Sequence, residues 1–128
     1  MVRVLLAVAH PSLRAALEEC LMPLADVSCG MAATAEELWD RLSRIPWDVV
    51  ILDLRLPDRT KFETVQRLHD LYPNLPILVI SLSRGVSPRR WQDAGACGFV
   101  AKGDLSRQLV EAIRVISCGG NYFPEGGG

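Results

Sequence analysis

Three side chains that could do chemistry stand at the ends of apolar segments in this sequence. Asp53 closes the segment DVVILD, Ser81 closes LPILVIS, and Lys102 directly follows GFVA. Each segment has the length and apolar composition of a buried β-strand. The carboxyl ends of parallel strands meet at one edge of a sheet, and ligands bind there in open α/β sheets. A carboxylate, a hydroxyl and an ammonium are therefore expected to converge at one site.

The first predicted strand, Val2–Val8, should end at the same edge but brings no reactive group to it. Its end is formed by Val8 and Ala9, within the stretch VRVLLAVAHPSLR. Neither side chain carries an oxygen, nitrogen or sulfur atom. This strand end therefore offers no side-chain ligand to a metal ion.

The elements that must position these residues follow from hydrophobic spacing along the chain. Apolar segments predict five strands, over residues 2–8, 27–30, 49–52, 77–80 and 98–101. Apolar residues at helical spacing predict a helix after each strand. Thr34 and Glu37 form a capping box at the second helix, and Pro88 after Ser87 marks the start of the fourth. Asp104 is expected to cap the last helix.

Strands that alternate with helices and are apolar on both faces predict a parallel sheet covered on each side. Right-handed crossovers then give a three-layer, doubly wound α/β sheet. The expected strand order is 2-1-3-4-5. Residues 1–120 are expected to form one domain, and the glycine-rich residues 121–128 a flexible tail.

Composition narrows the classes of function. The chain has 128 residues and a net charge of -1, which does not suit an electrostatic nucleic-acid binder. Charges or prolines interrupt every apolar run before it reaches membrane-spanning length, so no membrane partner is expected. The four cysteines are expected to be half-buried thiols in a cytoplasmic protein, since none has CxxC spacing: Cys20, Cys29, Cys97 and Cys118. No cofactor is expected.

Five ordered segments resemble the receiver domain of two-component response regulators, and most closely receivers that precede a helix-turn-helix DNA-binding domain. The segments are VRVLLAVAHPSLRAAL, DVVILDLRLPD, LPILVIS, AGACGFVAKGD and LVEAIRVISCGGNYF. The resemblance covers almost the whole chain. It implies a flavodoxin-like fold and transfer of a phosphoryl group from a histidine kinase to an aspartate. It also implies that any DNA contact is made by a domain absent from this chain.

The resemblance also assigns roles by motif position. Asp53 matches the phosphoacceptor, Ser81 matches the hydroxyl that follows the phosphoryl group, and Lys102 matches the lysine that contacts it. Phe99 matches the aromatic residue whose rotamer reports the state of the site. Asp58 occupies the position of a common loop acid.

Two positions depart from the family pattern in a way that concerns magnesium. The resemblance implies two acids that hold Mg²⁺ with the phosphoacceptor, but Val8 and Ala9 stand at their positions. Magnesium requires oxygen ligands, usually carboxylates with substrate phosphate. Asp53 and Lys102 already balance each other in charge. We therefore expect no metal in the pocket and a direct contact between these two side chains.

The sequence thus predicts an atypical receiver, a regulatory and dimerisation module that works without Mg-assisted phosphorylation in a transcription regulator. A homodimer is expected through a surface near Trp91, Arg89 and Arg90, because tryptophan and arginine often anchor interfaces. Packing of Trp91 into the core is the alternative. A histidine kinase or another protein is the expected further partner. Two other functions stay open: an inefficient phosphoacceptor at Asp53, or a small flavodoxin-like enzyme using Asp53 and Lys102. The enzyme lacks support, since no cofactor loop or nucleophile–base pair accompanies the two residues.

Overall fold

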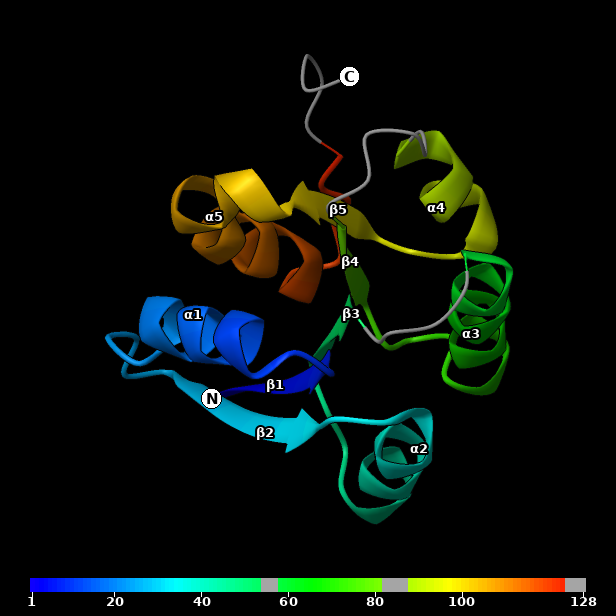
Figure 1. The fold of residues 1–128 in the computed structure, drawn as a ribbon, viewed down its shortest axis with the longest axis horizontal. Coiled ribbons are helices and arrows are strands. Elements are labelled where there is room, and N and C mark those ends of the chain that lie inside the picture. The colour runs from blue at the N-terminus through cyan, green and yellow to red at the C-terminus, as the bar shows by residue number, and fades with distance from the viewer. Residues whose placement is uncertain (54–57, 82–87, 124–128) are drawn as a thin grey trace.

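The computed structural model describes residues 1–53, 58–81 and 88–123, over which strands and helices alternate (Figure 1). The strands are β1 (Val2–Val8), β2 (Val27–Ala32), β3 (Val49–Asp53), β4 (Ile77–Ser81) and β5 (Gly98–Ala101). The helices are α1 (Pro11–Leu21), α2 (Ala35–Arg44), α3 (Asp58–Leu71), α4 (Pro88–Ala94) and α5 (Leu105–Ser117), with a 3-10 turn, η1 (Lys102–Asp104), before α5.

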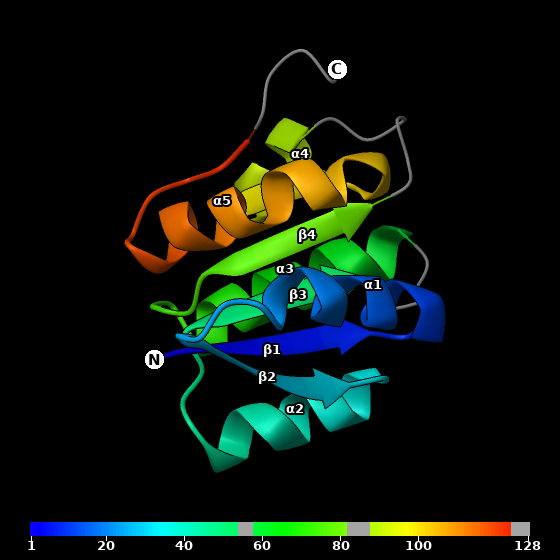
Figure 2. The same cartoon turned by 90° about the vertical axis from the view of Figure 1, so that its left-hand side faces the viewer.

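The sheet has the predicted architecture. All strand pairs are parallel and the order is β2-β1-β3-β4-β5, which confirms the predicted fold class. Helices α1 and α5 cover one face, and α2, α3 and α4 cover the other (Figure 1). The strands run side by side, with their carboxyl ends at one edge of the sheet (Figure 2). The three layers therefore bring the ends of β1, β3, β4 and β5 to a common edge.

Two hydrophobic cores hold the layers together because strand side chains alternate between faces. Val4, Leu6 and Val8 of β1 belong to the core under α1 and α5. Leu5 and Ala7 belong to the core under α2, α3 and α4. All five are completely buried. Burying a leucine or valine side chain is worth about 1.5–3 kcal/mol, so the apolar strands position the site above them rigidly.

Local capping sets where the helices begin. The Glu37 N–H donates to Thr34 Oγ1 over 3.1 Å, which confirms the cap predicted for α2. At α1 the cap is His10, whose Nδ1 accepts from the Ser12 N–H over 3.2 Å, followed by Pro11 as the first helical residue. His10 therefore has a structural role at the end of β1. Ser87, expected before α4, lies outside the described residues.

The expectation that Asp104 caps α5 through its side chain is wrong. Asp104 stands at the N-cap position, but its side chain makes no capping hydrogen bond. Its backbone angles, φ −109° and ψ 8°, differ from the extended conformation that lets an N-cap side chain reach back. The 3-10 turn η1 imposes these angles. The Asp104 carboxylate accepts instead from the Arg107 guanidinium, one turn along the helix.

The chain after α5 returns to the sheet rather than leaving it at residue 121. The Tyr122 N–H donates to the Cys97 carbonyl over 2.8 Å, and the Phe99 N–H donates to the Tyr122 carbonyl over 2.9 Å. Tyr122 thus forms a parallel bridge beside Gly98. The backbone of Tyr122 therefore pairs with the outer edge of β5.

The exposure of the four cysteines agrees only in part with the expectation. All four cysteines are free thiols; Cys20 and Cys97 are half-buried, whereas Cys29 and Cys118 are exposed. The expectation of four half-buried thiols is wrong for Cys29 and Cys118.

Within the described ranges, no helix has the length and apolar character needed to span a bilayer.

Candidate functional site

A carboxylate and an ammonium meet at the carboxyl edge of the sheet, as the sequence predicts. Lys102 Nζ lies 3.0 Å from Asp53 Oδ2, so the expected direct contact is confirmed. The Asp53 side chain is 10% exposed and that of Lys102 is 26% exposed. The carboxylate is therefore largely removed from water, while its cation reaches it from a more open position.

The backbone explains why these two residues meet. Asp53 is the last residue of β3, and the four residues before it are apolar and buried. Lys102 is the first residue of η1, which turns the chain from β5 into α5. The Ala9 N–H points at the Asp53 carbonyl over 3.4 Å, so β1 and β3 remain neighbours up to the site. The pair sits where three strands end.

Val8 forms part of the apolar floor of this site. The β1–β3 register sets Val8 opposite Asp53, and Val8 has no exposed surface. It packs in the core under α1 and α5, together with Leu13 and Leu105. Ala9, the next residue, is half-exposed. The two positions that the resemblance gives to acids therefore hold a valine buried in the core and a half-exposed alanine.

The residues at this edge do not fit a magnesium ion. The described part of the site offers one carboxylate, that of Asp53, and the Lys102 ammonium is 3.0 Å from one of its oxygens. The side chains of Val8 and Ala9 carry no atom that can bind a metal ion. Across the described residues, no group of three or more His, Cys, Asp or Glu side chains is placed to hold a metal. Magnesium needs several oxygen ligands, and a lysine on the remaining carboxylate competes with it.

Ser81, Asp58 and Phe99 are the other residues predicted for the pocket, and the structure describes them to different extents. Ser81 closes β4, and its backbone is paired with Ala101 of β5, but its side chain lies outside the described part of the chain, as does that of Asp58. Phe99 is half-buried and packs on the core under α2, α3 and α4. The structure thus brings together Asp53 and Lys102 over Val8, and sets Phe99 on the opposite face.

Trp91 is a core residue, which corrects its expected role as an exposed interface anchor. Its side chain is 2% exposed and stacks on Phe62 of α3. A helix of seven residues offers one narrow buried face, and Trp91 with Ala94 forms that face of α4. The spacing of these two residues, three apart, is compatible with one buried face but does not distinguish it from an exposed Trp91. Arg89 and Arg90 are exposed on the same helix.

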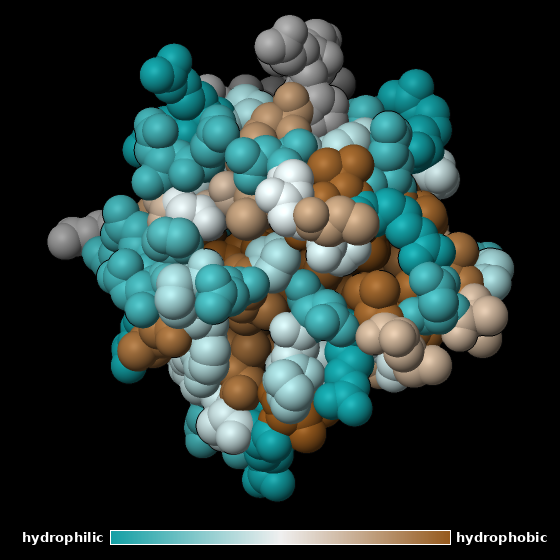
Figure 3. Space-filling view, turned by 180° about the vertical axis from the view of Figure 1, so that it is seen from behind, coloured by the Kyte–Doolittle hydropathy of each residue, from teal (hydrophilic) through white to brown (hydrophobic). Residues whose placement is uncertain are grey.

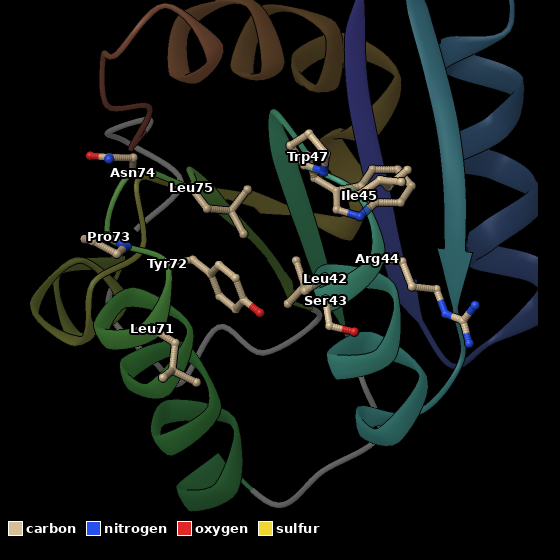
Figure 4. Close-up of a pocket in the computed structure, with 11 residues that line it drawn as sticks. Leu42, Ser43, Arg44, Ile45, Trp47, Leu71, Tyr72, Pro73, Asn74 and Leu75 are labelled. Atoms are coloured by element: carbon tan, nitrogen blue, oxygen red, sulfur yellow. The ribbon is translucent and has the colours of Figure 1, made fainter.

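Sequence reasoning missed a groove at the other end of the molecule. It has a volume of about 530 Å³ and lies between the carboxyl ends of α2 and α3 and the segments that follow them (Figure 4). Its walls include Trp47, whose Nε1 donates to the Arg41 carbonyl over 3.0 Å, and Tyr72. Ile45 and Leu71 line it and are exposed. The apolar segment Ile45–Trp47 was the available signal.

The molecular surface behind the view of Figure 1 shows hydrophobic side chains between hydrophilic ones (Figure 3). The hydrophobic areas are broken up by charged and polar residues. Such interspersed apolar surface is common on soluble domains and needs no ligand to explain it.

Comparison with known proteins agrees with this geometry. The family model described as the response regulator receiver domain matches residues 4–114. The response regulator GacA of Pseudomonas viridiflava is 27% identical over 96% of this chain and 58% of its own length. The transcriptional activator protein ExaE of Pseudomonas putida is 31% identical over 95% of this chain and 58% of its own length. This chain thus spans somewhat more than half the length of these relatives.

Solved structures share the fold. The isolated receiver domain of RcsB from Salmonella enterica serovar Typhimurium, in its apo form, superposes with a TM-score of 0.87 at 21% identity. That match covers 98% of this chain and 94% of the other. A LuxR family DNA-binding response regulator from Silicibacter pomeroyi gives a TM-score of 0.84 at 23% identity, with 98% of each chain covered. The family match, the sheet order and the Asp53–Lys102 edge lead to one conclusion: this chain belongs to the response regulator receiver domain family.

Proposed function

We propose that this receiver domain regulates its output without magnesium-assisted phosphorylation of Asp53. One observation carries the proposal: the Asp53 carboxylate, 10% exposed, has the Lys102 ammonium on it at 3.0 Å, above a completely buried Val8. In this proposal the pair is a structural contact that fixes η1 at the end of β5. The domain then acts as a signalling and interaction module.

The balance of charges in the pocket also supports regulation without magnesium. A site with several carboxylates and one lysine has an excess of negative charge that a divalent cation can neutralise. Here the described pocket contributes Asp53 and Lys102, whose charges cancel. A cation entering this site would meet an ammonium and apolar walls, and it would lose hydration in exchange for one carboxylate that Lys102 already contacts.

Magnesium titration tests the proposal. The backbone amide signals of Ala9 and Asp53 in the wild type are expected to stay unchanged up to about 10 mM Mg²⁺, because the site lacks oxygen ligands. Ala9→Asp adds a carboxylate at a half-exposed position without disturbing the core, and we expect this variant to show a saturable shift. A saturable shift in the wild type, at the same amides, would overturn the proposal.

A homodimer through α4 is part of the proposed function. Arg89, Arg90 and Asp93 are exposed on this helix. Two copies of α4 related by a two-fold axis bring opposite charges together if they run antiparallel. Sedimentation of the wild type is expected to show a dimer that Arg90→Glu weakens. Arg67→Glu, a charge reversal on exposed α3, should leave the dimer intact. A wild type that stays monomeric at high concentration would refute this part.

The proposed setting is a cytoplasmic transcription regulator whose DNA-binding domain lies outside this chain, with a histidine kinase or another protein as its input. The relatives support this setting, since one is a response regulator and the other a transcriptional activator protein, and both extend beyond the matched region. A second candidate, an inefficient phosphoacceptor at Asp53, is favoured by one observation. The acceptor carboxylate and its lysine are both retained and in contact.

A further inference from the structure

Helix α4 is fastened to α3 by three side chains, Phe62, Arg90 and Trp91, which we name the Phe62 stack. The ring centroids of Phe62 and Trp91 are 4.2 Å apart with planes 26° from parallel. The Arg90 guanidinium carbon lies 4.8 Å from the Phe62 centroid. Phe62 belongs to α3, and the other two belong to α4, which lies directly beside it (Figure 1). One ring of α3 therefore contacts two consecutive residues of α4.

The carboxyl end of α4 is also held against α3. Gly95 follows the helix with a φ of +117°, a conformation that favours glycine. A Cβ placed on Gly95 would lie 2.7 Å from the Cβ of His69 on α3, so no larger residue fits. The Ala96 N–H donates to the Trp91 carbonyl over 3.0 Å and closes the helix end. The middle and the carboxyl end of α4 thus both lie against α3.

The buried indole of Trp91 indicates that its ring, and not its N–H group, matters here. Among the described residues, Trp91 Nε1 is a buried polar atom without a hydrogen-bond partner. Leaving a buried donor unpaired is unfavourable, so the position must be held by the packing of the ring. A seven-residue helix is too short to be stable by itself. The position of α4 therefore depends on what it packs against.

We propose that the Phe62 stack is a packing lock that keeps α4 in one position whatever the state of Asp53. The lock deepens the proposed function, because a pocket that takes no phosphoryl group leaves the α4 surface to be set by packing. A signal at Asp53 could move α4 only through a difference in free energy large enough to break the stack. The exposed face of α4 then keeps one arrangement for the second copy of the proposed homodimer.

Hydrogen exchange of the whole chain, read by mass spectrometry, tests the lock through matched variants. Phe62→Leu and Trp91→Leu remove an aromatic ring but keep an apolar side chain. We expect them to raise the exchange rates of the α4 amides by about tenfold or more, while the β1 and β3 amides keep their protection. Phe62→Tyr and Trp91→Phe keep a ring in the stack, and their α4 amides should stay within about twofold of the wild type.

Two controls make the outcome decisive. Trp39→Leu removes another half-buried aromatic ring that packs against the same core, on α2 and outside the stack, and should leave α4 exchange unchanged. Arg90→Gln removes the cation without touching the core and should give a smaller increase at the same amides. Unchanged α4 exchange in Phe62→Leu would overturn the lock. So would an increase that Trp39→Leu reproduces.

A further arm separates the lock from the proposed function. The wild type is incubated with acetyl phosphate and Mg²⁺, and its intact mass and α4 exchange are measured in the same sample. An unchanged mass supports the proposed function, and the exchange of the Phe62 and Trp91 variants then decides the lock. A mass increase of one phosphate with protected α4 amides refutes the proposed function and supports the lock. A mass increase accompanied by faster α4 exchange refutes both.

Discussion

Val8→Asp is expected to lower the free energy of unfolding by about 3–5 kcal/mol at neutral pH, because it places an uncompensated carboxylate in the core. Val8 has no exposed surface and packs under α1 and α5. The β1–β3 register sets it opposite Asp53, whose carboxylate already has Lys102 at 3.0 Å. One ammonium would then face two carboxylates, so like-charge repulsion adds to the cost of burial.

The size of this loss is expected to depend on pH. Burial and the charge of Asp53 both raise the pKa of the introduced carboxyl in the folded state above the value of about 3.9 in the unfolded chain. The folded state then binds more protons than the unfolded state between the two pKa values. The penalty is therefore complete above the raised pKa and shrinks as the pH falls through it. Urea unfolding at about pH 7 and about pH 5 measures the difference.

Val8→Asn is the matched control, since asparagine has the shape of aspartate without its charge. This variant should also be destabilised, because it buries an amide, but its loss should be nearly the same at both pH values. If Val8→Asp were as stable as Val8→Asn at neutral pH, the edge of the sheet would have room and charge for a second acid. That result would contradict a closed, charge-balanced site.

The positions of Asp53 and Lys102 could be predicted because they depend on topology. In a sheet of parallel strands the carboxyl ends all lie at one edge, so the ends of β3 and β5 are expected to share it. The strand end beside Asp53 is Val8, which is apolar. In the described part of the site, Lys102 is therefore the available partner for the Asp53 carboxylate. The sequence alone therefore predicts the fold, the edge and the ion pair.

Other features depend on packing that hydrophobic spacing does not encode. The face of α4 that carries Trp91 is decided by Phe62, a residue on another helix, so an exposed and a buried tryptophan could not be separated from sequence. The pairing of Tyr122 with β5 satisfies backbone groups, and a glycine-rich composition gives no sign of it. Asp104 has the right residue type for a cap, but η1 sets its backbone.

Phosphorylation of the wild type is expected to be slower by several orders of magnitude than in a receiver with a magnesium site. A Lewis acid on the transferring phosphoryl group contributes several kcal/mol to the transition state. Each loss of about 1.4 kcal/mol lowers the rate tenfold. Asp53 is also only 10% exposed, so a phosphodonor has little access to its carboxylate.

Incubation with acetyl phosphate and millimolar Mg²⁺, followed by intact-mass measurement, decides whether Asp53 accepts a phosphoryl group. The mass of the wild type is expected to stay unchanged, as is that of Asp53→Asn, which cannot accept a phosphoryl group at this position. Ala9→Asp is run beside them as the variant that regains a magnesium ligand. An increase of one phosphate in the wild type that Asp53→Asn abolishes would show that Asp53 is a working phosphoacceptor.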